Sequence, residues 1–66
     1  MTIEEIQAQG EWARAFGKAK RENPYFAIDE LPETEEELKE WEKKVSAWDL
    51  GWELEDAYRN ALKYRE

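Results

Sequence analysis

The stretch Trp48-Asp49-Leu50-Gly51-Trp52 decides the fold of this chain. Two tryptophans stand four residues apart, so on a helix their rings share one face. A glycine stands between them, although glycine within a helix costs about 1 kcal/mol relative to alanine. Such a poor helix former beside two of the largest side chains indicates close packing. We therefore predict that another backbone approaches Gly51 and that the Trp48 and Trp52 rings flank it.

The helix that contains this stretch is predicted to run from about residue 35 to residue 64. Up to Gly51, large apolar side chains recur at intervals of three and four residues, as on one helix face. They are Leu38, Trp41, Val45, Trp48 and Trp52. Beyond Gly51 the apolar positions move to another face. The helix therefore either bends near residue 50 or runs through and uses two faces. The later apolar positions are Leu54, Tyr58, Ala61 and Leu62.

A shorter helix is predicted from about residue 3 to residue 21. Its apolar face carries Gly10, Ala13 and Gly17 on one line. Small residues at this spacing allow another helix to approach closely. The alternative is that the two glycines are only tolerated in a fraying helix. We favour close packing, because both glycines fall on the apolar face.

Start and stop signals bound the two helices. Thr2 with Glu5, and Thr34 with Glu37, each fit a capping box. Pro24 stops the first helix, because proline lacks the amide and disfavours the helical conformation of the preceding residue. The chain is therefore predicted to be one all-α domain over residues 1–66, a two-helix hairpin with a short first helix and a long second one.

The composition limits the chemistry that the chain can perform. No cysteine and no histidine occur among the 66 residues, which excludes disulfides, thiolate metal sites and a histidine general base. With a single serine and no glycine-rich phosphate loop, we expect a non-catalytic protein without a cofactor. The uncharged stretches are too short to cross a membrane, and no signal-peptide pattern is present. The expected location is the cytoplasm.

All of the net charge lies in one window of the sequence. The chain carries −7, and residues 29–42 contain eight acids and one base. The residues on either side of this window are balanced. The carboxylates either form a solvated helix face or bind a basic surface, and the ligand spacing of a calcium loop is missing. We therefore expect no metal. The candidate binding residues in the window are Glu35, Glu36, Glu40 and Glu42.

A smaller basic strip lies on another face of the first predicted helix. Arg14, Lys18 and Arg21 recur at i, i+4 and i+7, with Lys20 beside them. Bases in the last turns of a helix interact favourably with its macrodipole. The alternative is that the strip contacts phosphate or an acidic partner. These four bases and Tyr25, which follows in the turn, complete the set of candidate binding residues.

Three motifs together resemble a known family. Gly10, Gly17 and Pro24-Tyr25 form the pattern Gly-x6-Gly-x6-Pro-Tyr, and Trp48-x2-Gly51-Trp52 follows. In this order and spacing the chain resembles the ribosome modulation factor family and its short relatives in bacteria and phages. The resemblance implies a two-helix fold and a protein that binds ribosomal RNA at the small subunit and promotes inactive ribosome dimers. It assigns structural roles to Gly10, Gly17, Pro24, Trp48, Gly51 and Trp52.

Two departures from the family pattern change the expected partner. Family members of this type are basic, and here the stretch between the Pro-Tyr turn and the tryptophan motif is longer and acidic. RNA affinity comes mainly from lysines and arginines that neutralise phosphates. Direct nucleic-acid binding is therefore expected to be weak or absent. The partner is either the ribosome, with the acidic face pointing away, or a basic nucleic-acid-binding host protein that an acidic phage protein inhibits. A monomer and a homodimer both remain open.

Overall fold

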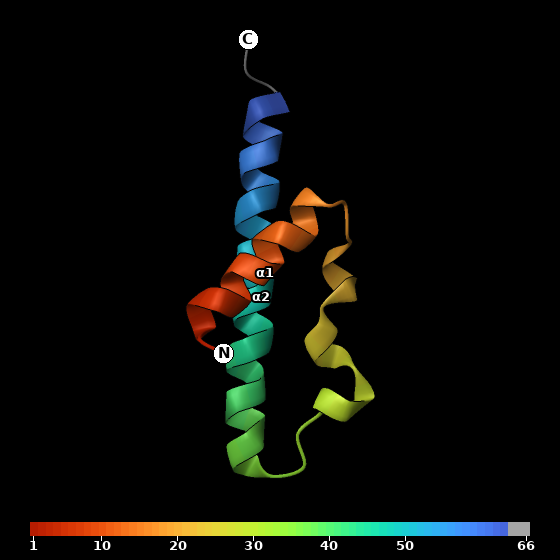
Figure 1. The fold of residues 1–66 in the computed structure, drawn as a ribbon, viewed down its shortest axis with the longest axis vertical. Helices are drawn as coiled ribbons and strands as arrows, with labels where there is room; N and C mark the ends of the chain where they lie inside the picture. The colour runs from red at the N-terminus through yellow and green to blue at the C-terminus, as the bar shows by residue number, and fades with distance from the viewer. Residues whose placement is uncertain (64–66) are drawn as a thin grey trace.

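The computed structural model describes residues 1–63, and in this part of the chain every regular element is helical (Figure 1). Helix α1 spans Ile3–Ala15 and helix α2 spans Glu35–Lys63. Three short 3-10 turns connect them, η1 (Lys20–Glu22), η2 (Pro24–Phe26) and η3 (Ile28–Glu30). The predicted all-α hairpin of a short and a long helix is confirmed.

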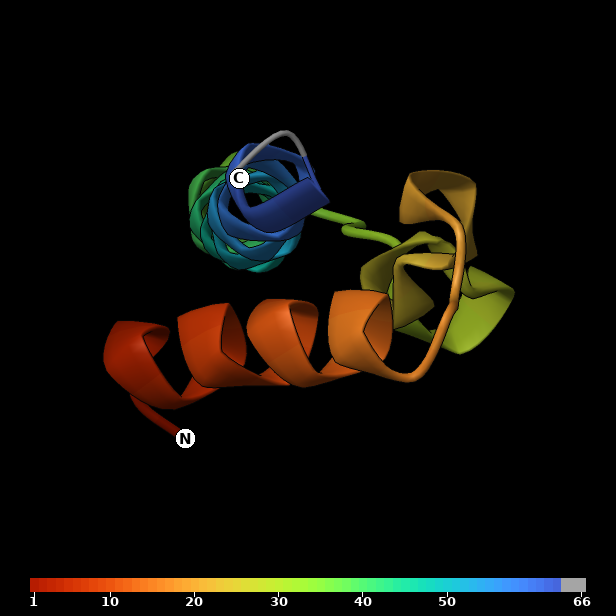
Figure 2. The same cartoon turned by 90° about the horizontal axis from the view of Figure 1, so that it is seen from above.

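Helix α2 runs the length of the molecule, and the other elements lie along it. Helix α1 crosses α2 near its middle, and the turns η1 to η3 follow the N-terminal half of α2 (Figure 1). Seen along α2, helix α1 and the turns lie on two different sides of it (Figure 2). The C-terminal half of α2 extends beyond both. Within residues 1–63, neither helix combines the length and the apolarity that crossing a membrane needs.

Two glycines let the backbones of α1 and α2 meet where the helices cross. A Cβ at Gly51 would overlap the carbonyl oxygen of Gln7, and a Cβ at Gly10 would overlap the carbonyl oxygen of Trp48. Both glycines are buried. The prediction that another backbone approaches Gly51 is therefore confirmed, and so is close packing at Gly10.

The apolar core is small and lies at this crossing. Trp48 is 2% exposed, whereas Trp52 is half-buried and packs against the edge of the core. The indole Nε1 of Trp52 donates a hydrogen bond to the carbonyl oxygen of Lys18 at 2.8 Å. The two rings of the tryptophan motif thus have different roles. Trp48 fills the core, and Trp52 fixes the segment that follows α1. The buried apolar residues are Ile6, Ala13, Ala47 and Trp48.

Helix α1 ends at Ala15, and the prediction that it continues to residue 21 is wrong. Gly17 has a φ of +84°, a left-handed conformation that glycine adopts without a Cβ penalty. The amide of Lys18 donates to the carbonyl of Ala13 at 2.9 Å, and that of Gly17 donates to Arg14 at 3.0 Å. These are the two bonds of a Schellman motif. Apart from Gly17 itself and its two chain neighbours, no heavy atom lies within 4 Å of a Cβ built at this position. This glycine therefore ends the helix, and the expected close packing at this position is wrong.

Both helices begin after the predicted threonines, but with different caps. Thr2 and Glu5 form the complete capping box, with two hydrogen bonds of 3.1 Å. At α2, the hydroxyl of Thr34 accepts from the amide of Glu37 at 3.1 Å. The carboxylate of Glu37, however, accepts from the amide of Glu33 at 2.9 Å. Only half of the second predicted box therefore forms, because the Glu37 side chain reaches one residue further back.

Helix α2 is continuous through Gly51, so it runs through and uses two faces; its predicted end at residue 64 lies outside the described residues. Helix α1 covers only the middle of the predicted aromatic stripe. Trp41 is covered by the turns instead. Its Nε1 donates to the carbonyl of Tyr25 at 2.6 Å, and its ring meets that of Phe26 edge-on with centroids 5.6 Å apart.

Candidate functional site

Asn23 fixes the turns against α2, a role that was not predicted. Its side chain is 3% exposed. The amide nitrogen donates to Asp49 Oδ1 at 3.1 Å and to the carbonyl of Val45 at 3.3 Å. The amide oxygen accepts from the backbone amide of Tyr25 at 2.9 Å. An asparagine directly before Pro24 is the sequence signal for such a turn, but the contacts with α2 have no local signal.

The turns fixed in this way enclose a hollow at the acidic end of the molecule. Its volume is about 460 Å³, and its apolar lining residues are Leu31, Pro32 and Trp41. Lys44 is the one base in the lining. We call it the acidic hollow, because five exposed acidic residues also line it. They come from η3 and the first turns of α2, and they are Asp29, Glu30, Glu36, Glu37 and Glu40.

The hollow brings together only part of the predicted acidic set. Glu36 and Glu40 line it, whereas Glu35 and Glu42 are exposed on α2 outside its lining. Asp29 and Glu30 were not singled out from the sequence. They join the site because the chain folds back along α2, which places η3 beside the start of that helix.

Lysines and arginines of the chain neutralise little of the negative charge around the acidic hollow. Between residues 1 and 63, the acids of the window form one ion pair, from Glu40 to Lys43 at 3.6 Å, and both side chains are largely exposed. An exposed pair of this kind contributes little energy. Charges closer than the Debye length of about 10 Å reinforce one another's potential. The hollow therefore presents a concentrated negative potential to solvent.

The arrangement of the carboxylates suits an extended cation rather than a metal ion. In the part of the chain that the structure describes, no group of three acidic side chains could hold a metal ion. The acids share the lining of the hollow with apolar residues instead. An arginine or lysine side chain matches this layout, because its aliphatic stem can lie on apolar surface while its charged head stays at the rim.

Two of the four bases predicted to form a binding strip are paired within the molecule. Arg14 Nε donates to Asp56 Oδ1 at 2.7 Å, and the guanidinium lies over the Trp52 ring at 5.7 Å from its centroid. Lys20 Nζ donates to Glu53 Oε1 at 2.9 Å, which raises the pKa of Lys20. These ion pairs attach α1 and η1 to α2, so the charges of Arg14 and Lys20 are matched within the molecule.

The other two bases, Lys18 and Arg21, are exposed. Neither forms an ion pair with any residue between 1 and 63. The i, i+4, i+7 strip does not exist, because Gly17 ends the helix between Arg14 and the later bases. The sequence showed where the bases lie along the chain, but their common face depended on a helix that stops earlier.

Tyr25 connects the acidic end to the core. It is half-buried against the core, and its hydroxyl donates to Gln9 Oε1 at 3.2 Å. Burial and, to a smaller extent, the negative charge of Glu30 raise the pKa of the Tyr25 hydroxyl. Because Tyr25 is half-buried, only part of its side chain is available to a partner, and its role as a binding residue stays a prediction.

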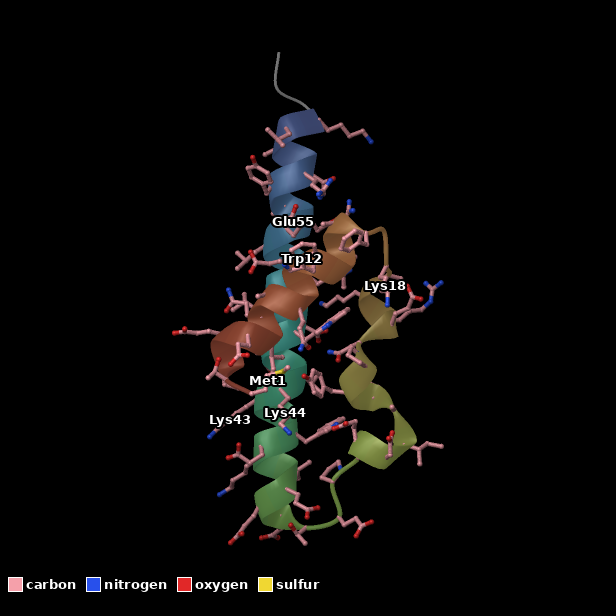
Figure 3. All side chains as sticks on the ribbon, viewed as in Figure 1. Met1, Trp12, Lys18, Lys43, Lys44 and Glu55 are labelled. Atoms are coloured by element: carbon pink, nitrogen blue, oxygen red, sulfur yellow. The ribbon has the colours of Figure 1, made fainter. Side chains whose placement is uncertain are left out.

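An exposed aromatic pair forms a second surface feature, which was not predicted as a site. Trp12 and Phe16 are 65% and 72% exposed, and their rings stack with centroids 5.3 Å apart. Trp12 lies beside Glu55 of α2, and the two residues line a small hollow (Figure 3). Both aromatics lie outside the set of α1 residues that are buried, which are Ile6, Gly10 and Ala13.

The chain matches no protein-family model, no curated protein and no solved structure in the comparisons. The resemblance to the ribosome modulation factor family therefore stays a prediction from the motifs. In the structure, the motif residues have distinct roles. Gly10 and Gly51 lie at the helix crossing, Gly17 ends α1, and Pro24 begins η2.

Proposed function

We propose that this chain is a non-catalytic binding protein that engages a basic surface of a partner protein through its acidic hollow. The supporting observation is the hollow that five exposed acidic residues line together with Leu31, Pro32 and Trp41. An arginine of the partner gains charge-assisted hydrogen bonds from the carboxylates. Its stem and guanidinium also gain contact with the Trp41 ring.

Proteins that bind nucleic acids are the partners with this chemistry, because their contact surfaces carry clustered lysines and arginines. A chain that occupies such a surface competes directly with the nucleic acid. The cellular effect that we infer is inhibition of a nucleic-acid-binding protein of the host. No catalytic step is required for this effect.

The second candidate function is the one that the family resemblance implies, a contact with ribosomal RNA that modulates translation. It is supported by Lys18 and Arg21, which are exposed and outside the ion pairs described above. It is weakened by Arg14 and Lys20, whose charges are matched by Asp56 and Glu53. Fewer available bases mean fewer neutralised phosphates and hence lower RNA affinity.

Titration with an arginine-rich peptide, followed by calorimetry at low and high salt, tests the proposal. The double variant Glu36→Gln/Glu40→Gln is expected to lose about a hundredfold or more in affinity, since it removes two charge-assisted hydrogen bonds that are each worth about 1.5–3 kcal/mol. The matched control Glu35→Gln/Glu42→Gln removes the same number of charges from outside the hollow, and a much smaller loss is expected. Equal losses in both variants, or no binding at low salt, would overturn the proposal.

Sedimentation with purified ribosomes tests the second candidate with different variants. If the ribosome contact runs through the exposed bases, Lys18→Glu/Arg21→Glu abolishes co-sedimentation at low salt and the hollow variants do not. Absence of the wild-type chain from the ribosome pellet at low salt would reject this candidate. The two experiments use different residues, so one function can fail while the other stands.

A further inference from the structure

The C-terminal half of α2 carries an apolar stripe that no other element within residues 1–63 covers. The large members Leu50, Leu54, Tyr58 and Leu62 are 48%, 49%, 61% and 45% exposed. Helix α1 crosses α2 on another face, and the turns lie along the other half (Figure 1). We call this face the α2 stripe, and its members are Leu50, Leu54, Ala57, Tyr58, Ala61 and Leu62.

The stripe is large in comparison with the interior of the protein. Among residues 1–63, four apolar residues are buried in the core, and a chain of 66 residues buries only about 60% of the surface that its unfolded chain exposes. Contiguous exposed apolar surface marks an interaction site in a stable protein. Small domains commonly gain the missing burial by association.

We propose that the α2 stripe binds the same stripe of a second copy of this chain, with the two α2 helices antiparallel. This inference does not depend on the proposed function, because the acidic hollow lies in the other half of α2. Two observations identify the occupant as a second copy. They are the distribution of charge along α2 and the self-complementary edge of the stripe.

The two halves of α2 differ in charge. The balanced C-terminal half can pack against the same half of a second copy, whereas the acidic N-terminal half would repel its counterpart. Residues 43–63 contain four acids and four bases, whereas residues 29–42 contain eight acids and one base. An antiparallel pair that meets near position 56 places the two acidic ends at opposite ends of the dimer. Along the helix, position 35 is about 30 Å from position 56, well beyond the Debye length of about 10 Å. A parallel pair would place the acidic ends side by side.

The edge of the stripe is complementary to itself. Glu55 and Arg59 lie along one edge and pair within the helix at 2.8 Å. When two such helices run antiparallel about position 56, Arg59 of each copy comes next to Glu55 of the other. A two-fold symmetric contact requires this reciprocity, because the same patch meets itself. The opposite edge carries Glu53 and Asn60, which do not clash in the same arrangement.

A hollow at the N-terminal end of the stripe, beside Leu50, can accommodate a side chain of the second copy. Ile3, Ala47 and Leu50 line a largely apolar hollow of about 410 Å³ between α1 and α2. In the antiparallel arrangement, position 62 of one copy faces position 50 of the other. Leu62 therefore supplies the apolar side chain that fills this hollow, and Leu54 lies opposite Tyr58.

Sedimentation equilibrium over a range of concentrations tests the dimer. The wild-type chain is expected to show dimer mass at high concentration, and Leu54→Glu is expected to weaken the association at least a hundredfold. The matched control is Ile28→Glu, because Ile28 is 88% exposed and lies outside the stripe; its dimer is expected to match the wild type. Far-ultraviolet circular dichroism checks that each variant keeps its helices. Monomer mass for the wild type at all concentrations, or an unchanged dimer in Leu54→Glu, would overturn the proposal.

Reversing the edge charges tests complementarity without changing the apolar stripe. Arg59→Glu gathers four carboxylates along one edge of the dimer and is expected to weaken it. The double variant Glu55→Arg/Arg59→Glu restores alternating charge and is expected to restore the association. Failure of the double variant to recover any affinity would contradict the antiparallel pairing.

Cysteine cross-linking tests the orientation directly, because the chain contains no cysteine of its own. Ala57→Cys lies next to the two-fold axis and is expected to form a disulfide-linked dimer on mild oxidation. Leu50→Cys alone is expected not to cross-link, but to do so when mixed with Leu62→Cys. Efficient cross-linking of Leu50→Cys to itself would show a parallel pair and reject the proposal.

Discussion

Gly51 of α2 lies against the carbonyl oxygen of Gln7 in α1, and no Cβ fits between them. Gly10 has the reciprocal relation to the carbonyl oxygen of Trp48. Each helix therefore contributes one glycine and receives the backbone of the other. A backbone-to-backbone contact cannot be relieved by rotating a side chain, so these two positions determine how closely the helices pack.

Gly51→Ala and Gly10→Ala are each expected to destabilise the protein by about 2 kcal/mol or more, because the helices must separate to admit a Cβ. Elsewhere in a helix the same substitution stabilises by about 1 kcal/mol, so the sign of the effect is diagnostic. Thermal unfolding followed by circular dichroism measures it. The control Glu42→Gly, at an exposed position of α2 outside both the stripe and the acidic hollow, is expected to lower the free energy of unfolding only by the propensity difference. An unchanged or raised Tm in Gly51→Ala would contradict the close approach.

Substitutions of Gly17 are expected to lower the Tm through backbone strain rather than through a steric clash. Space is available for a Cβ, but the left-handed conformation costs an ordinary residue about 1–2 kcal/mol. Asparagine tolerates this conformation better than alanine does. The Tm is therefore expected to fall in the order glycine, asparagine, alanine at position 17. If Gly17→Asn and Gly17→Ala melted together, strain at this position would not be the cause.

Asn23→Ala is expected to lower the free energy of unfolding by about 2 kcal/mol or more. The reason is that the carbonyl of Val45, the carboxylate of Asp49 and the amide of Tyr25 each lose a hydrogen-bond partner. Asn23→Asp places a carboxylate beside Asp49, so the pKa of the new group is raised in the folded state. An acid with a raised pKa binds its proton more tightly in the folded state, so this variant gains stability as the pH falls through that pKa. Urea unfolding over a pH series measures the effect.

Asn60→Asp is the matched control for that experiment. Asn60 also donates to an aspartate, Asp56, at 3.3 Å, but it is exposed. Solvent screens an exposed pair of like charges, so a small pH dependence is expected. An equal response of the two variants would show that burial of Asn23 does not matter to the turn.

Alkaline pH is expected to weaken the fold through Tyr25. Its pKa is raised above the ordinary value of 10.0 by burial and then by Glu30. The unfolded chain releases this proton at lower pH than the folded chain does. The contribution of Tyr25 to stability is therefore complete below the ordinary pKa and is lost as the pH rises through the raised one.

Glu30→Gln separates the two causes of this shift. It is expected to lower the pKa of Tyr25 part of the way toward its ordinary value, because burial remains. Tyrosinate absorbance measures this pKa in a Tyr58→Phe/Tyr64→Phe background, in which Tyr25 is the tyrosine that titrates. A pKa unaffected by Glu30→Gln would mean that this charge does not reach Tyr25.

The helices could be predicted from the sequence wherever the determinants are local. The capping box of Thr2 and Glu5 and the aromatic spacing around Trp48 involve residues within one or two turns of each other. Gly17 and Gly51 look alike at this level, since both interrupt an apolar face. One packs against Gln7 and the other ends a helix, and only the path of the rest of the chain distinguishes them.

The sequence showed that the candidate site is rich in acidic residues, but it did not show which of them lie together. The sequence identified Glu36 and Glu40 as candidates, but their grouping with Asp29 and Glu30 depends on the turn that Asn23 attaches to α2. That attachment joins residues more than twenty positions apart. The ion pair of Arg14 and Asp56 is equally non-local. Long-range contacts of this kind decide which charges are matched internally and which remain for a partner.

The uneven charge distribution affects how the molecule is oriented when it diffuses toward a charged partner. The protein is a rod of 50 × 19 × 16 Å, and its net charge of −7 is concentrated near the start of α2. In the proposed antiparallel dimer the two axial dipoles cancel, whereas a monomer of this shape has a large electric dipole along its axis. In the field of a positively charged surface it experiences a torque and aligns before any contact forms. Successive encounters then begin with the same end, which raises the association rate and makes that rate fall steeply with ionic strength.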